Sequence, residues 1–264
     1  MIMTALAANR KSPYLLGDWA ETQKRDIVND GVMYSGGIVA VDYLAEAHPG
    51  ADTLGLRVIG VNETAKIDNA DDGEEILPEK RIYRLGNSTT YPLTIANIAQ
   101  VCYVEDDQTV AGDSTNRVAA GIVFDVDSTG VWVDMRSSAL ALACSQAKKV
   151  IVAVTATTST LTAAQCFAGN VIVTASNSGA TTLTLPTAIA GYKIGIQRLT
   201  AEAGYDVTIQ APAGDTVLGS AAAGTAANTT DAISDILYIA TNGPVDWVAD
   251  VPYAKDVASW LIAS

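Results

Sequence analysis

Residues 101–110 read Val-Cys-Tyr-Val-Glu-Asp-Asp-Gln-Thr-Val, two short apolar runs on either side of an acidic turn. β-Branched and aromatic side chains favour strands, and Asp in a turn accepts hydrogen bonds from its own backbone, so this stretch predicts a β-hairpin. Residues 118–126 and 130–134 (Gly-Val-Trp-Val-Asp) predict two further strands, and residues 56–61 and 81–85 predict two earlier ones. Short strands separated by turn residues predict a small β-barrel or sandwich.

The whole chain predicts an all-β protein in four parts. An extended arm over residues 1–30 precedes a barrel- or sandwich-like β-domain over residues 31–136. A short helical connector over residues 137–149, rich in Ala, Ser and Leu, joins it to a second, sandwich-like β-domain over residues 150–264. In that second domain, the alternation Thr-Leu-Thr-Leu at residues 182–185 is typical of a half-buried strand.

Charge and composition narrow the possible functions. The formal net charge is −13, so the chain lacks the excess of Lys and Arg with which proteins bind nucleic acid or an anionic membrane. No apolar run approaches the roughly 18 residues of a membrane-spanning helix, and residues 1–16 do not predict a signal peptide. The three cysteines, Cys102, Cys144 and Cys166, form no C-x-x-C pair and predict buried thiols in a reducing cytoplasm.

The sequence does not contain the common motifs of catalytic or cofactor chemistry. The chain has one histidine, His48, and no G-x-S-x-G, P-loop or dinucleotide-binding motif, so we expect no enzyme, no cofactor and no metal site. The carboxylates of Glu105 and Asp106 could serve a glycoside hydrolase, but their place in the expected hairpin favours a turn. The acidic residues 71–75 lack the alternating ligand spacing of a calcium loop and predict a solvated loop.

The order of the pieces between residues 54 and 135 resembles the head-decoration (capsid cement or minor capsid) proteins of tailed bacteriophages. Residues 103–110 and the Trp-Val-Asp of residues 132–134 carry most of that resemblance. It implies a structural virion protein on the outer surface of the head, made in the cytoplasm of the host bacterium. Such a protein binds the phage major capsid protein across subunit junctions and stabilises the head against internal DNA pressure. The resemblance also implies a homo-oligomer, with a trimer favoured and a dimer as the alternative.

The N-terminal arm is a candidate capsid-binding segment under that resemblance, because arms of cement proteins often pair with the shell. Its polar centre contains Arg10, Lys11, Pro13 and Tyr14, which we expect to contact the capsid. The alternative interpretation of this segment is an ordinary flexible terminus.

The second domain supports an alternative function. Many cement proteins end soon after the Trp-Val-Asp strand, and the second domain is only weakly similar to accessory β-domains of phage structural proteins. A carbohydrate- or receptor-binding tail-fibre or adhesin module is therefore the alternative, with Tyr192, Tyr205 and Trp247 as candidate surface-adhesion residues. Aromatic side chains in β-domains are also common in cores, so the same positions have a purely structural interpretation.

Overall fold

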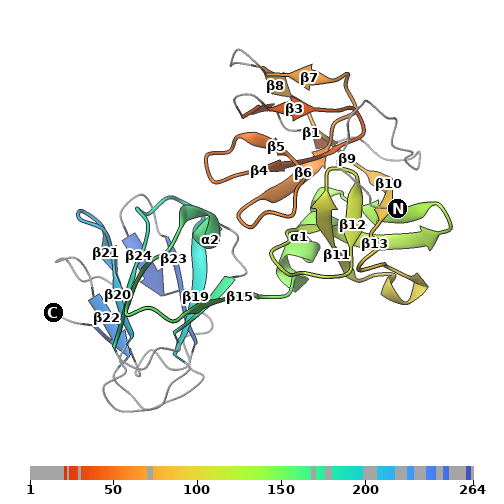
Figure 1. Ribbon diagram of the computed structural model, residues 1–264. Helices are drawn as coiled ribbons and strands as arrows, with labels where there is room; N and C mark the ends of the chain where they lie inside the picture. Colours follow the sequence, from red (N-terminus) through yellow and green to blue (C-terminus); the bar gives the residue numbers. More distant parts are fainter. Residues whose placement is uncertain are drawn as a thin grey trace. The chain divides into compact units, whose positions relative to one another are not determined.

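The computed structural model describes residues 21–22, 24–28, 31–69, 74–167, 171–175, 180–198, 207–217, 225–228, 236–241, 246–249 and 260–262. β-Strands make up most of the regular structure in this part of the chain (Figure 1), so the predicted all-β fold is confirmed. The chain divides into two compact units, residues 1–148 and residues 149–264.

The first unit begins with a five-stranded sheet. Its strands, in spatial order, are β1 (Glu21–Thr22), β9 (Glu79–Lys80), β6 (Arg57–Val61), β4 (Ile38–Val41) and β5 (Ala47–Pro49). All described pairs in this sheet are antiparallel. Two short ladders accompany it, β2 (Arg25–Asp26) with β8 (Glu75–Ile76) and β3 (Val32–Met33) with β7 (Ile67–Asp68).

Strand β4 is buried along its whole length because it contributes to two hydrophobic clusters. Alternate residues of a strand point to opposite faces. Ile38 and Ala40 accordingly join a large cluster together with barrel residues, whereas Val39 and Val41 join a smaller cluster on the other side. The sheet is therefore packed on both faces at β4, which fixes the position of the hairpin that follows this strand.

A closed barrel forms the rest of the first unit. Its strands, in spatial order, are β10 (Ile82–Asn87), β12 (Thr109–Ala111), β11 (Val101–Asp106), β13 (Ala119–Asp127) and β14 (Gly130–Asp134). The predicted hairpin is confirmed as β11 and β12, and the Asp106 carboxylate accepts a hydrogen bond from the Gln108 amide in its turn. Buried Tyr83 and Leu85 of β10 pair with Val133 and Val131 of β14, which closes the barrel.

Two helical segments pack on this barrel. The 3-10 helix η1 (Ile95–Asn97) lies between β10 and β11 in the chain. Helix α1 (Ser137–Gln146) forms within the segment that predicts a helical connector, and it buries Ala139, Leu140 and Ala143. It contacts β13 and β11 and so belongs to the first unit, whose last residue is Lys148.

The second unit consists of two sheets. One contains β15 (Val150–Val154), β17 (Val171–Ala175), β19 (Lys193–Arg198), β23 (Ile236–Thr241), β24 (Asp246–Ala249) and β21 (Thr216–Val217). The other contains β16 (Thr158–Thr160), β18 (Thr181–Thr184), β20 (Val207–Gln210), β22 (Thr225–Asn228) and β25 (Trp260–Ile262). The short helix α2 (Ala163–Phe167) lies between β16 and β17 in the chain.

The first strands of the second unit are added to the two sheets in turn. Strands β15, β17 and β19 pair in parallel in one sheet, and β16, β18 and β20 pair in parallel in the other. Each pass of the chain thus adds one strand to each sheet, as in a β-solenoid. The strands after β20 close this arrangement mainly with antiparallel pairs.

Candidate functional site

A cluster of three potential metal ligands lies at the β4–β5 hairpin. The backbone amide of Asp42 donates to the carbonyl of Glu46 (3.1 Å), and the amide of Ala45 donates to the carbonyl of Asp42 (3.2 Å). Ala45 has a left-handed φ of 65°. A three-residue loop that ends in a left-handed residue is a common hairpin connection, and here it places Asp42 directly opposite Glu46.

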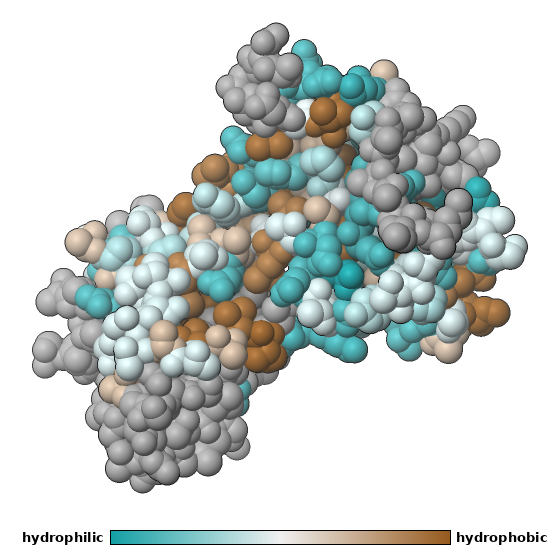
Figure 2. Space-filling view, in the orientation of Figure 1, coloured by the Kyte–Doolittle hydropathy of each residue, from teal (hydrophilic) through white to brown (hydrophobic). Residues whose placement is uncertain are grey.

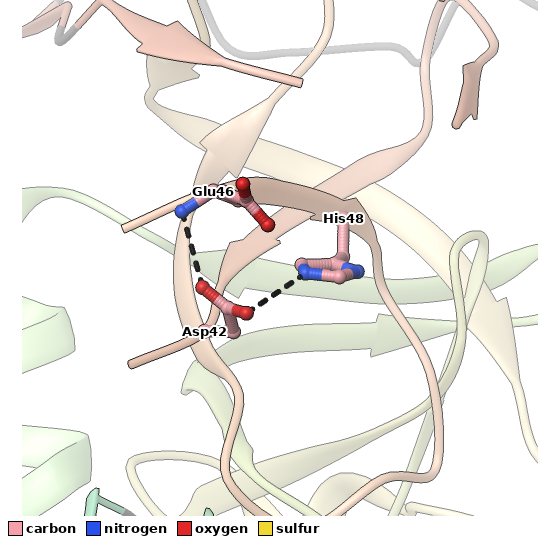
Figure 3. Close-up of side chains that lie close together, drawn as sticks. All are labelled: Asp42, Glu46 and His48. Carbon is pink, nitrogen blue, oxygen red and sulfur yellow. Dashed lines mark hydrogen bonds and ion pairs between the residues drawn. The ribbon is translucent and has the colours of Figure 1, made fainter. Parts of the chain in front are cut away.

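The register of the hairpin brings His48 to the same place. His48 pairs with Ala40, and side chains two residues apart on a strand share a face. The carboxylates of Asp42 and Glu46 and the imidazole of His48 therefore lie on one side of the hairpin (Figure 3), with one ligand atom from each within 4.8 Å of the others. Asp42 Oδ2 lies 3.4 Å from His48 Nε2.

The cluster is half-buried and partly fixed by hydrogen bonds. Asp42 Oδ1 accepts from the Leu44 amide (2.9 Å) and from the Glu46 amide (3.1 Å), which leaves Oδ2 directed toward the imidazole. Among the residues that the structure describes, no other group of three carboxylate, imidazole or thiol side chains comes this close together. Sequence reasoning missed the cluster because its members converge only once the hairpin register is known.

The predicted capsid-contact residues Arg10, Lys11, Pro13 and Tyr14 lie outside the described residues. The described chain starts at β1, which among the described strands lies at the edge of the five-stranded sheet and pairs with β9. Shortly after it, Lys24 forms an ion pair with Glu75, and β2 pairs with β8.

Three exposed apolar residues belong to the two segments that meet where η1 contacts the barrel. The amide of Ala99 donates to the carbonyl of Val123 (2.8 Å), which holds the end of the η1 segment against β13. Beside this junction Ile95 is 71% exposed, Ile98 40% and Phe124 48%. We call these three side chains the η1 surface. Figure 2 shows hydrophobic side chains on the molecular surface, between hydrophilic ones.

The candidate adhesion residues in the second unit do not form a surface platform. Tyr192 is 1% exposed and Trp247 is fully buried, and their ring centroids are 6.0 Å apart. The amide of Thr241 donates to the carbonyl of Tyr192, and Thr241 pairs with Trp247, so backbone pairing brings both rings into the core. In the structure Tyr192 and Trp247 are core residues and not the surface-adhesion residues that the sequence predicts. The third candidate, Tyr205, lies outside the described residues.

The second unit instead presents rows of hydroxyl groups. Thr158, Thr182 and Thr208 occupy paired positions on the parallel strands β16, β18 and β20. Thr160 and Thr184 form a second such pair. The residues between them on β18 and β20 are buried, so these threonines lie on the outer face of the sheet. We call them the threonine rows; neighbouring hydroxyls in a row are about 4.8 Å apart, the spacing of paired strands.

Comparisons of the chain with known proteins gave no match. No family model matches the chain, and neither the curated proteins nor the solved structures gave a significant similarity. Within the described residues, no helix is long and apolar enough to cross a membrane.

Proposed function

We propose that this chain is a structural protein of a tailed-bacteriophage head, which binds the outside of the capsid across subunit junctions and stabilises the head against internal DNA pressure. The observation that carries the proposal is the η1 surface, an exposed apolar group of side chains on the barrel. That barrel is built from the segment that resembles capsid cement proteins. Exposed apolar side chains grouped on one part of a surface are typical of protein–protein interaction sites.

The position of β1 gives separate support for the proposal. An edge strand offers unpaired backbone groups, and partners often bind by adding a strand there. In this proposal, a segment of a neighbouring capsid subunit pairs with the sheet at β1. Binding across a junction stabilises only the assembled shell, by mass action on the assembled state. In this proposal the partners are the major capsid protein and other copies of the chain, most simply as a trimer.

The test is add-back of the purified protein to heads that lack it. We expect saturable binding and greater resistance of the heads to heat or osmotic shock. Ile95→Asp with Ile98→Asp should weaken binding at least about tenfold, because a charge would enter an apolar contact. Leu142→Asp, at a similarly exposed apolar position on α1, should leave binding unchanged.

Three further results decide the interpretation of this experiment. Deletion of residues 1–20 should also weaken binding if the arm contacts the shell. If the Ile95 and Ile98 variant changes the mass of the free protein but not head binding, the η1 surface is a contact between copies. If the wild-type protein fails to bind heads, and heads without it are equally stable, the proposal is wrong.

The threonine rows favour one second candidate, a carbohydrate-binding adhesin module. Regularly spaced hydroxyls can exchange hydrogen bonds with an extended polysaccharide, because each hydroxyl both donates and accepts. Full-length protein should then bind a glycan array, and replacing Thr158, Thr182 and Thr208 by Val should abolish that binding while keeping the side-chain shape. Thr115→Val, at an exposed site in the first unit, is the control. No glycan binding by the wild-type protein would reject this candidate.

A further inference from the structure

We propose that Asp42, Glu46 and His48 bind a divalent transition-metal ion of the zinc class at the β4–β5 hairpin. The proposal is independent of the function in the virion. It starts from the proximity of the three side chains, which lie close together in Figure 3. One ligand atom from each lies within 4.8 Å of the other two. Zinc bonds of about 2.0–2.2 Å to nitrogen and oxygen place ligand atoms roughly 3–3.5 Å apart. In this proposal, rotation of the side chains on binding closes the remaining distance.

The surroundings of the His48 imidazole are a second observation that favours a bound ion. His48 Nε2 is shielded from solvent and forms no hydrogen bond with the residues that the structure describes. It faces Asp42 Oδ2 at 3.4 Å. The contact with Asp42 is an ion pair and is longer than an ordinary hydrogen bond, and a metal ion between this nitrogen and the two carboxylates would bind all three groups. The imidazole thus provides a nitrogen ligand that is directed into the cluster.

The hairpin also provides the outer contacts that metal sites use. The amides of Leu44 and Glu46 donate to Asp42 Oδ1 and hold this carboxylate in place. Metal-binding carboxylates are commonly oriented by hydrogen bonds of this kind. Since Asp42 and Glu46 flank the loop and His48 lies in strand β5, a bound ion would connect the two sides of the hairpin and restrict its opening.

The choice of metal follows from the ligands. One imidazole nitrogen with two carboxylates suits zinc and its neighbours in the first transition series, whereas calcium and magnesium prefer oxygen ligands only. Three protein ligands also leave at least one coordination position open in a tetrahedral site. Water, or a side chain of a neighbouring molecule in an assembly, can fill that position.

The single histidine of the chain makes a direct experiment possible. In a ¹H–¹³C NMR titration with zinc chloride, the one imidazole resonance should shift and saturate at one ion per chain. Calorimetry on the same full-length protein should give the same stoichiometry. Both measurements are made in a Cys144→Ser background, because Cys144 is an exposed thiol that could bind zinc by itself. Magnesium chloride should cause no saturating shift.

Substitutions separate the site from adventitious binding. His48→Gln and Glu46→Gln should each weaken zinc binding by more than the roughly 10–100-fold that loss of an outer contact costs. Asp68→Asn, which removes one carboxylate from an exposed position of strand β7 in the same unit, should leave affinity unchanged. An imidazole resonance that does not move with zinc in the wild-type protein overturns the proposal, whether or not the variants fold. Equal zinc affinity in His48→Gln and wild type also overturns it.

Discussion

Ala45 is a residue whose backbone is under strain. Its φ of 65° lies in the left-handed region, which costs an alanine about 1–2 kcal/mol. Ala45→Gly removes that cost but adds about 0.4–1 kcal/mol of backbone entropy in the unfolded chain. We therefore expect a net gain of about 0.5–1 kcal/mol in the free energy of unfolding, measured by urea denaturation.

The matched control for this prediction is Ala96→Gly. Ala96 is exposed and belongs to η1, and its φ is not positive. Glycine there should only lower stability. A loss of stability in both variants would show that the left-handed conformation at Ala45 is not strained.

The carboxyl of Asp127 has a lowered pKa because four hydrogen bonds favour its charged form. Hydrogen bonds from the Thr129 hydroxyl, then from the Trp132 indole and the backbone amides of Thr129 and Gly130, lower the pKa of this carboxyl to about 2. An unfolded Asp has a pKa of about 3.9. The folded pKa is the lower one, so this stabilisation is complete above about pH 4 and is lost as the pH falls through 2.

We expect Thr129→Ala to raise the pKa of Asp127 toward its ordinary value, because it removes the hydroxyl that contributes most to the shift. The measurement is an NMR titration of the Asp127 carboxyl carbon between pH 1 and 6. Ser128→Ala, in the same turn, should leave the pKa unchanged. A titration midpoint that does not respond to loss of the Thr129 hydroxyl would contradict the assignment.

At the scale of elements, Gly60 allows β6 to pass close to β9. Its φ is +145°, and a Cβ atom there would lie 2.5 Å from the carbonyl oxygen of Glu79. The neighbouring pair Val61 and Glu79 joins the two strands. Gly60→Ala must push β9 away or distort the β4–β6 ladder, so we expect a loss of about 2 kcal/mol or more in the free energy of unfolding.

Gly112→Ala is the control for that prediction. A Cβ at Gly112 would meet Leu93 at 3.5 Å, an ordinary contact distance, so stability should change little. Hydrogen exchange of the β6 and β9 amides locates the effect. Increased exchange confined to other strands would contradict a clash between β6 and β9.

Elements specified by neighbouring residues were predictable from the sequence. The β11–β12 hairpin follows from two apolar runs and a turn in which Asp106 accepts from the Gln108 amide, all within residues 101–111. The helix within residues 137–149 follows from local propensity in the same way. Each of these features depends on residues that are adjacent in the chain.

Features that depend on distant pairing were not predictable. The alternation of Thr and Leu in β18 indicates a strand, but it does not specify a parallel partner such as β20. The sequence offers Trp247 both a surface-adhesion role and a core position, and the pairing of Trp247 with Thr241 leaves its ring fully buried. The Asp42, Glu46 and His48 cluster depends in the same way on the hairpin register and on the left-handed Ala45. A single sequence contains all of these residues but does not show which of them pair.

At the scale of the whole molecule, each unit has a hydrophobic core of its own. Leu85 in the first unit and Leu183 in the second are both almost fully buried, at 1% and 0% exposure. The division of the chain falls after Lys148. The finer organisation into an arm, two domains and a connector stays a prediction, as do the location and the partners of the protein.

Two separate cores predict two separate unfolding transitions. Leu85→Ala and Leu183→Ala remove the same side chain from one core each, and each should cost about 2–5 kcal/mol through lost burial and a cavity. In differential scanning calorimetry each substitution should lower one transition by roughly 10 °C and leave the other in place. Both substitutions replace Leu with Ala. If they lower different transitions, the difference therefore depends only on which core contains the leucine. If both substitutions lower a single shared transition, the two units unfold as one cooperative body, and the independence of their cores is rejected.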